Sequence, residues 1–187
     1  MTDLLLVALA AATVNNPAAL RMLGLGTLLG DGLPPANATG AALATVLGAT
    51  IAAVACHLLD SLVLRPNELG FLRIIAFLVL TTGAVAIAAR ISARLLGQAP
   101  ALPLLLINGV VVGMVLLEMR TMHTPWDALA TGLGAGLGYS LILVLFAGLQ
   151  PRLERAAVPA PLRGPAIGLI TLGITSMALV GFSGLGN

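Results

Sequence analysis

Only a few side chains in this 187-residue sequence could take part in acid–base or metal chemistry, and they are widely separated. Asp60 and Glu118 stand at the ends of apolar runs, where each could lie on an ion path or simply be solvated at a membrane surface. His57 has an acid three residues later, but neither it nor His123 has a second histidine at ligand spacing. The pattern therefore predicts no metal site and leaves Asp60 and Glu118 as candidate ion-path residues.

The motifs of bond-making enzymes are absent from the sequence. It contains no serine–histidine–acid set, no paired carboxylates and no P-loop. Its single cysteine, Cys56, excludes an internal disulfide and a cysteine-rich metal site, and we expect it to be a small apolar residue in a buried helix. Nine arginines without a basic stripe, and six aromatic residues, do not predict binding to nucleic acid. We therefore expect a chain that is not catalytic alone.

Two polar interruptions fall inside apolar segments. The first is Asn15-Asn16-Pro17, and the second is Asn108-Gly109. The apolar run before the first interruption rises only about 16 Å as a helix, and a proline cannot donate the hydrogen bond that a continuing helix needs. Irregular backbone at membrane depth must pack against protein or line a cavity. Each segment is therefore expected to be a broken helix or a pair of half-helices.

The elements that hold these residues are expected to be membrane-spanning helices. Hydrophobic residues make up 59% of the chain and charged residues 9%, with a mean hydropathy of +1.08, whereas soluble domains carry about 25% charged residues. Apolar segments recur between short turns, at the length that a hydrocarbon core of about 30 Å requires. The sequence thus predicts an all-α integral membrane protein with six spans, near residues 4–30, 39–63, 70–89, 100–118, 128–149 and 164–183.

Part of the second expected span recurs in the fifth. Residues 42–49 read ALATVLGA and residues 128–135 read ALATGLGA. The repeating unit would hold three spans, residues 1–95 and 96–187, and an odd number of spans inverts the second copy in the membrane. Inverted repeats with broken helices at corresponding positions predict a site at the midplane between the repeats. That site would lie among the two interrupted segments.

Small residues spaced four apart predict where helices approach closely. Gly132 and Gly136 have this spacing in the fifth expected span, as do Ala44 and Gly48 in the second. A glycine-rich phosphate cradle is the alternative interpretation, but no strand or polar helix start accompanies these glycines. We therefore expect close helix packing at these positions.

The arginines predict the orientation of the chain. With six spans, three arginines share a side with both termini and five lie on the opposite side. Because cytoplasmic loops carry the excess of basic residues, both termini are expected outside the cytoplasm. Arg21 lies within the first expected span, so it should either reach the membrane surface or meet a partner acid.

Short motifs in order along the whole chain resemble a known family. They are VNN at 14–16, LGL at 23–25, FLR at 71–73, PLL at 103–105, VPAPLRG at 158–164 and GFSGL at 181–185. The chain resembles the RnfA/NqrE family, most closely the RnfA members from Rnf ion-translocating electron transport complexes and more distantly the NqrE members from the sodium-pumping NADH:quinone reductase. The resemblance implies six spans in two inverted three-span repeats, with broken first and fourth spans, in a bacterial inner membrane with both termini periplasmic.

The resemblance also implies a function and its partners. Rnf complexes couple electron transfer between ferredoxin and NAD to the movement of Na⁺ or H⁺. The implied partners are the homologous RnfE together with RnfD and RnfG, and the partner subunits carry the flavins and the other iron–sulfur clusters. RnfA and RnfE share a [2Fe-2S] cluster, to which each broken span of RnfA gives a cysteine.

This sequence departs from the family pattern at both cysteines. The matching positions are Gly26 and Gly109. Iron in such clusters needs thiolate or imidazole ligands, which glycine does not supply. We therefore expect no cofactor from this chain alone, and a scaffold or ion-path role in the complex.

Two other functions remain open from the sequence. A small secondary transporter can also be built from inverted repeats, but it would act alone and usually carries an acid near the centre of a span, which this sequence lacks. A membrane assembly protein without transport activity is the other alternative.

Overall fold

The computed structural model describes residues 8, 12, 21, 23–24, 26, 35–97, 109–118, 123–156 and 158–181, and the regular elements within these ranges are all helical. The all-α prediction is confirmed for this part of the chain. In order, the elements are α4 (Pro35–Leu59), the π-helical turn η1 (Asp60–Leu64), the short 3₁₀ helix η2 (Gly70–Leu72), α5 (Arg73–Leu96), α7 (Gly109–Glu118), α8 (Pro125–Arg155), the 3₁₀ helix η3 (Ala160–Leu162) and α9 (Pro165–Gly181).

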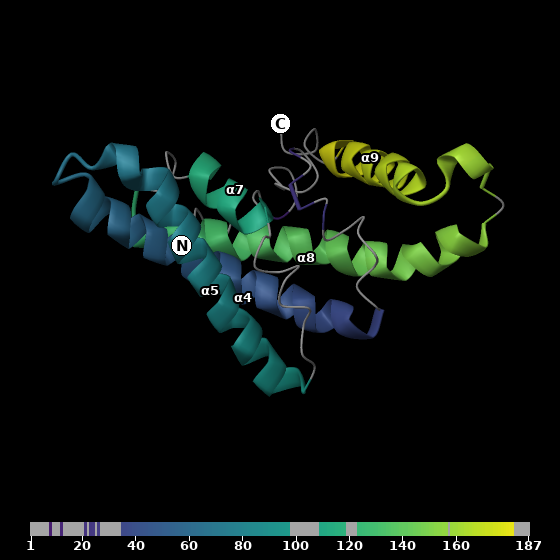
Figure 1. Cartoon of the computed structure of the whole chain (residues 1–187), viewed down its shortest axis with the longest axis horizontal. Helices are drawn as coiled ribbons and strands as arrows, with labels where there is room; N and C mark the ends of the chain where they lie inside the picture. Colours follow the sequence, from purple (N-terminus) through teal and green to yellow (C-terminus); the bar gives the residue numbers. More distant parts are fainter. Residues whose placement is uncertain are drawn as a thin grey trace.

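Helices α4 and α8 lie side by side and antiparallel at the centre of the molecule (Figure 1). Glycines of α8 determine how closely the two helices approach each other. A Cβ placed on Gly136 would lie 2.8 Å from the Cα of Val46, and one on Gly132 would lie 2.9 Å from the backbone of α4. Ser140 adds a hydrogen bond, because its hydroxyl donates to the carbonyl of Ala42 at 3.0 Å. The two backbones therefore touch along this seam, as the spacing of small residues predicts.

Helix α5 crosses α4 obliquely and packs on it (Figure 1). A Cβ on Gly48 would lie 3.2 Å from Cγ2 of Val85, and the hydroxyl of Ser92 donates to the carbonyl of Gly40 at 2.7 Å. The other face of α5 carries large exposed apolar side chains, including Ile74, Ile75, Leu78 and Val79. An apolar face that points outward from a helix with a buried inner face is typical of a membrane protein.

Several threonine hydroxyl groups on α4 and α5 are satisfied within their own helix. Thr45 donates to the carbonyl of Ala41 at 2.8 Å, and Thr81 donates to the carbonyl of Phe77 at 2.7 Å. A hydroxyl bonded to the carbonyl four residues earlier leaves no unpaired donor to face lipid. These threonines therefore need no water to satisfy their hydroxyl groups.

In the described part of the chain, three helical segments are long and apolar enough to cross a membrane: Ala38–Leu64, Gly70–Leu96 and Pro125–Leu153. Each rises about 40 Å, more than a hydrocarbon core of about 30 Å. They correspond to the second, third and fifth expected spans. Helix α9 corresponds to the sixth and is shorter. Helix α7 covers the end of the fourth and has 10 residues, which rise only about 15 Å. Most of the first expected span lies outside the described residues.

The ends of two helices are fixed by local chemistry. At the start of α8, the hydroxyl of Thr124 accepts from the backbone N–H of Asp127, and the carboxylate of Asp127 accepts from the backbone N–H of Thr124. This reciprocal capping box satisfies two backbone donors that the helix cannot satisfy itself. At its C-terminal end, α5 stops at Gly97, whose φ of +65° is a left-handed conformation that glycine adopts without strain.

Candidate functional site

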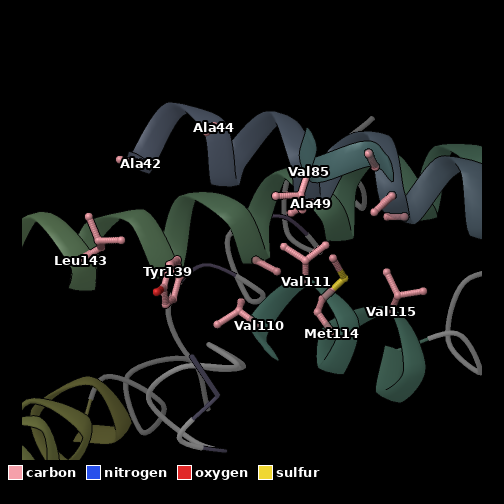
Figure 2. Packing of buried hydrophobic residues seen from close by; sticks show 14 of the residues in the cluster. Ala42, Ala44, Ala49, Val85, Val110, Val111, Met114, Val115, Tyr139 and Leu143 are labelled. Atoms are coloured by element: carbon pink, nitrogen blue, oxygen red, sulfur yellow. The ribbon is translucent and has the colours of Figure 1, made fainter. Parts of the chain in front are cut away.

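Residues 23–24, from the first expected span, lie against the start of α7. Gly24 has a φ of +78°, and a Cβ on it would lie 2.5 Å from Cγ2 of Val110 and 2.8 Å from Cε2 of Tyr139. Figure 2 shows the side chains of Val110 and Tyr139 close together, one from α7 and the other from α8. Both the backbone conformation and the lack of space therefore require glycine at position 24.

The neighbouring residue, Leu23, occupies the space that a side chain at Gly113 would take. A Cβ on Gly113 would lie 2.6 Å from Cδ1 of Leu23. We call the contact of residues 23–24 with α7 and Tyr139 the Gly24 junction. The inner face of α7 continues from this junction as a buried apolar row (Figure 2), made of Val110, Val111, Met114 and Val115.

The two positions expected to match the family's cluster ligands lie beside this junction. Gly26 and Gly109 are both exposed on the surface of the chain. Among the residues that the structure describes, a Cβ on Gly26 would have no neighbour within 4 Å, and one on Gly109 would have the backbone nitrogen of Gly24 at 3.8 Å. The residues expected to mark the helix breaks lie outside the described residues: Asn15, Asn16, Pro17 and Asn108.

The residues at the Gly24 junction do not fit an iron–sulfur cluster. Leu23, Val110 and Tyr139 offer neither thiolate nor imidazole, which are the ligands that iron in such clusters needs. Cys56 lies in α4, fully buried. In the ranges that the structure describes, no three side chains of His, Cys, Asp or Glu are grouped to hold a metal ion.

A buried carboxylate lies at the end of α4, where Asp60 begins the π-helical turn η1. One of its oxygens accepts from Nε of Arg65 at 2.6 Å, and the other accepts from Nε of Arg73 at 2.8 Å. Asp60 is 1% exposed, so the alternative that it is solvated at a membrane surface was wrong. A carboxylate can be buried here because both of its oxygens are paired with guanidinium groups. We call these three residues the Asp60 clamp.

The clamp ties both ends of the α4–α5 connection to a single side chain. Arg65 follows η1 directly, and Arg73 is the first residue of α5. Within the connection, the backbone N–H of Leu69 donates to the carbonyl of Leu64 at 2.9 Å, and Glu68 has a φ of +56°. The clamp therefore fixes the conformation of the connection between α4 and α5.

The remaining polar candidates are dispersed. Glu118 is the last residue of α7. His57 is buried one turn before Asp60, and its Nδ1 has no hydrogen-bond partner in the described part of the chain. His123 and Arg21 are exposed.

Sequence reasoning did not single out Arg65, Arg73 or Tyr139. A signal for Arg73 existed, because a cation in the first turn of a helix is unfavourable unless an acid pairs with it. Tyr139 is the single tyrosine of the chain and lies in an apolar segment, where its hydroxyl needs a polar partner. Arg65 had no comparable signal.

Comparison with known proteins gives the family. A family model described as "Rnf-Nqr subunit, membrane protein" matches residues 4–186. Relatives named as the A component of an "Ion-translocating oxidoreductase complex" include one from Pseudomonas paraeruginosa, 40% identical over 99% of this chain and 98% of the relative. The relative from Proteus mirabilis has the same name and is 38% identical over 99% of this chain and 98% of its own length. The relative from Shewanella loihica also has this name and is 33% identical over 100% of both chains. These matches confirm the resemblance, and the chain belongs to the Rnf-Nqr family of membrane subunits.

Proposed function

We propose that this chain is the RnfA-type membrane component of an ion-translocating oxidoreductase complex. The observation that carries the proposal is its alignment over 98% and 100% of the length of relatives with that name. In this role the chain is not catalytic alone. The complex couples electron transfer between ferredoxin and NAD to the movement of Na⁺ or H⁺, and partner subunits, including RnfE, RnfD and RnfG, carry the flavins and the other iron–sulfur clusters.

We further propose six spans in two inverted repeats, residues 1–95 and 96–187. The α4–α8 contact supports this arrangement. The repeated sequence relates residue 42 to residue 128, a shift of 128 − 42 = 86. The same shift takes Val46 to Gly132 and Thr50 to Gly136. A Cβ on Gly136 would meet Val46, and a Cβ on Gly132 would meet Thr50. A two-fold axis between the helices would exchange these two contacts, as inverted repeats require.

Of the two candidate ion-path residues, Asp60 is the less suited to bind a cation. Both oxygens of Asp60 are bonded to guanidinium groups, so a cation would have to displace two positive charges to bind there. We therefore assign Asp60 to the α4–α5 connection and place the candidate ion-path carboxylate at Glu118. Glu118→Gln is expected to reduce Na⁺ or H⁺ transport by the reconstituted complex with subunit content unchanged, whereas Asp60→Asn is expected to reduce assembly. Full transport with Glu118→Gln would exclude this path.

The proposed location is the bacterial inner membrane, with both termini periplasmic. The distribution of arginines supports this orientation, since five of those outside the first span lie on the side opposite the termini and three on the same side. Membrane-impermeant thiol labelling tests it, with a cysteine added at either terminus in a Cys56→Ala background. Both termini should react in intact spheroplasts. If both are protected from the reagent, the orientation is opposite to the one proposed.

Gentle solubilisation of the native membrane tests the proposed function itself. A tagged full chain is expected to copurify with a flavin-containing complex that oxidises or reduces NAD. A chain that purifies alone and transports a solute in liposomes would instead be a secondary transporter, an activity that the names of its relatives do not favour. Copurification with flavin-containing subunits would exclude the transporter.

A further inference from the structure

The Asp60 clamp contains two guanidinium groups and one carboxylate, so it has an excess of positive charge. One arginine would be enough to neutralise Asp60. Glu68, the other acid of this connection, forms an ion pair with neither arginine in the described part of the chain. A buried ion pair also adds little net stability over apolar packing. Stability of the fold alone therefore does not account for the second arginine.

Both arginines of the clamp have hydrogen-bond donors to spare. Nε of each donates to Asp60, but a guanidinium also has N–H groups on Nη1 and Nη2. Among the described residues, Asp60 is the single partner of both side chains, which are 57% and 39% exposed. Two guanidinium groups on one carboxylate are close enough for a phosphate group to accept from both, and hydrogen bonds between guanidinium and phosphate are strong.

The π-helical turn η1 brings the first of these arginines to the carboxylate. Arg65 follows Asp60 by five residues, whereas side chains three or four residues apart are the neighbours in an α-helix. In η1 the backbone N–H of Arg65 donates to the carbonyl of Asp60 at 2.9 Å, and this wider turn lets the two side chains meet. Turns of this kind occur frequently at functional sites. Here the turn positions Arg65 beside Arg73, which begins α5.

The clamp lies where two segments that can cross a membrane are joined. Asp60 is near the end of Ala38–Leu64, and Arg73 is near the beginning of Gly70–Leu96. Each segment rises about 40 Å, which exceeds the hydrocarbon core of about 30 Å and extends into the headgroup layers. The two arginines are therefore expected at the depth of the lipid phosphates.

Large apolar side chains next to the clamp in the chain are exposed. Leu62 in η1 is 70% exposed, Phe71 in η2 is 76% exposed, and Ile74 in the first turn of α5 is 66% exposed. A soluble anion would gain nothing from these side chains, whereas a phospholipid has acyl chains that can cover them. Positive charge beside exposed apolar surface, at headgroup depth, favours a lipid over an acidic partner protein.

We propose that the Asp60 clamp binds the phosphate group of an anionic phospholipid. Arg65 and Arg73 donate to the phosphate oxygens, and Asp60 positions both guanidinium groups without contacting the lipid. A zwitterionic lipid also has a phosphate, but the excess positive charge of the clamp repels its ammonium group. This binding concerns the membrane around the chain and does not depend on electron transfer or ion transport.

Native mass spectrometry of the full chain in a non-ionic detergent tests the proposal. Phosphatidylglycerol and phosphatidylcholine with identical acyl chains are titrated separately, and the dissociation constant of the first bound lipid is measured. We expect phosphatidylglycerol to bind at least about 10-fold more tightly, because arginines at a membrane surface attract anionic lipid. Equal affinity for the two lipids would overturn the proposal.

Single substitutions distinguish the clamp from general attraction between charges. R65Q and R73Q each remove the excess charge but leave Asp60 paired with the other arginine, so both variants are expected to fold. In each, the preference for phosphatidylglycerol should fall to within about 3-fold. R90Q is the matched control, because Arg90 is exposed toward the other end of α5 and its loss changes the net charge equally. The control should keep the preference, and an equal loss in R90Q would contradict a specific site.

A conservative double variant keeps the test valid if a glutamine variant does not fold. R65K/R73K retains both positive charges beside Asp60 but lacks the planar group that binds phosphate through two N–H donors. Binding of phosphatidylglycerol should weaken at least about 3-fold. Unchanged binding in this variant would also count against the clamp.

Two further comparisons separate the lipid from other anions. Phosphatidylglycerol should raise the melting temperature of the chain, whereas inorganic phosphate in excess should not, and equal protection by both would assign the clamp to a soluble anion. The complex purified with R73Q should keep its subunits and lose bound phosphatidylglycerol. Loss of a subunit with unchanged lipid content would instead show that the arginines pair with an acidic partner protein, and the proposal would fail.

Discussion

Gly136 of α8 lies so close to Val46 of α4 that a Cβ on the glycine would be 2.8 Å from the Val46 Cα. The obstructing atoms belong to backbone, which cannot rotate away as a side chain can. Gly136→Ala is therefore expected to push the helices apart and to lower the free energy of unfolding by about 1–3 kcal/mol. Thermal unfolding of the detergent-solubilised chain, followed by circular dichroism, measures the loss.

Gly148→Ala provides the control for this prediction, because a Cβ at Gly148 in the same helix would meet none of the described residues within 4 Å. That substitution should be neutral or stabilising by up to about 1 kcal/mol, since alanine favours the helix. Equal melting temperatures for the two variants would contradict the close contact of α4 and α8.

The Asp60 clamp is expected to respond non-additively to substitution. Arg65→Ala or Arg73→Ala leaves one guanidinium on the carboxylate, and because these arginines are 57% and 39% exposed, each should cost only about 1 kcal/mol. The double variant leaves a buried carboxylate without a partner, which should cost about 3–5 kcal/mol. Unfolding of the four chains in a double-mutant cycle measures the coupling. Losses that simply add would show that the arginines do not share the carboxylate.

The capping box at the start of α8 should contribute measurably to stability. Thr124→Ala removes the acceptor for the backbone N–H of Asp127 and is expected to cost about 1 kcal/mol. Thr124→Ser keeps a hydroxyl and should retain most of that stability. Chemical unfolding of both variants makes the comparison, and a serine variant as unstable as the alanine variant would argue against the cap.

Gly24→Ala should destabilise the chain far more than Gly26→Ala. At Gly24 the added Cβ meets both a left-handed backbone conformation and the side chains of Val110 and Tyr139, a combination expected to cost about 2–4 kcal/mol. At Gly26 it meets no described residue within 4 Å. The melting temperatures of the two single variants measure this difference in stability. A Gly24→Ala chain with unchanged stability would rule out the junction as described.

Apolar length was a dependable guide to the long helices, because a hydrocarbon core demands a run of about 20 apolar residues whatever their order. The expected spans 39–63 and 128–149 fall within Ala38–Leu64 and Pro125–Leu153. The glycine spacing at Gly132 and Gly136 likewise predicted close helix contact. The spacing did not reveal which helix is the partner. Gly132 and Gly136 contact α4, whereas Gly48, which has the same spacing from Ala44, packs against Val85 of α5.

The polar residues were harder to predict, because their roles depend on neighbours distant in sequence. An acid at the end of an apolar run looks the same whether water or arginine surrounds it, and Asp60 has a partner 13 residues away in Arg73. The Gly24 junction combines residues from three segments, with Tyr139 more than a hundred residues from Gly24. The ion-path role of Glu118 stays a prediction.

The seam between α4 and α8 also has a genetic consequence. Glycine is the smallest amino acid, so every missense change in the codons of Gly132 and Gly136 enlarges the residue and drives atoms into the opposing backbone. These two codons should tolerate synonymous change only, whereas the codons of Gly148 and Gly173, where a Cβ would meet no described residue within 4 Å, should accept alanine without strain inside this part of the chain.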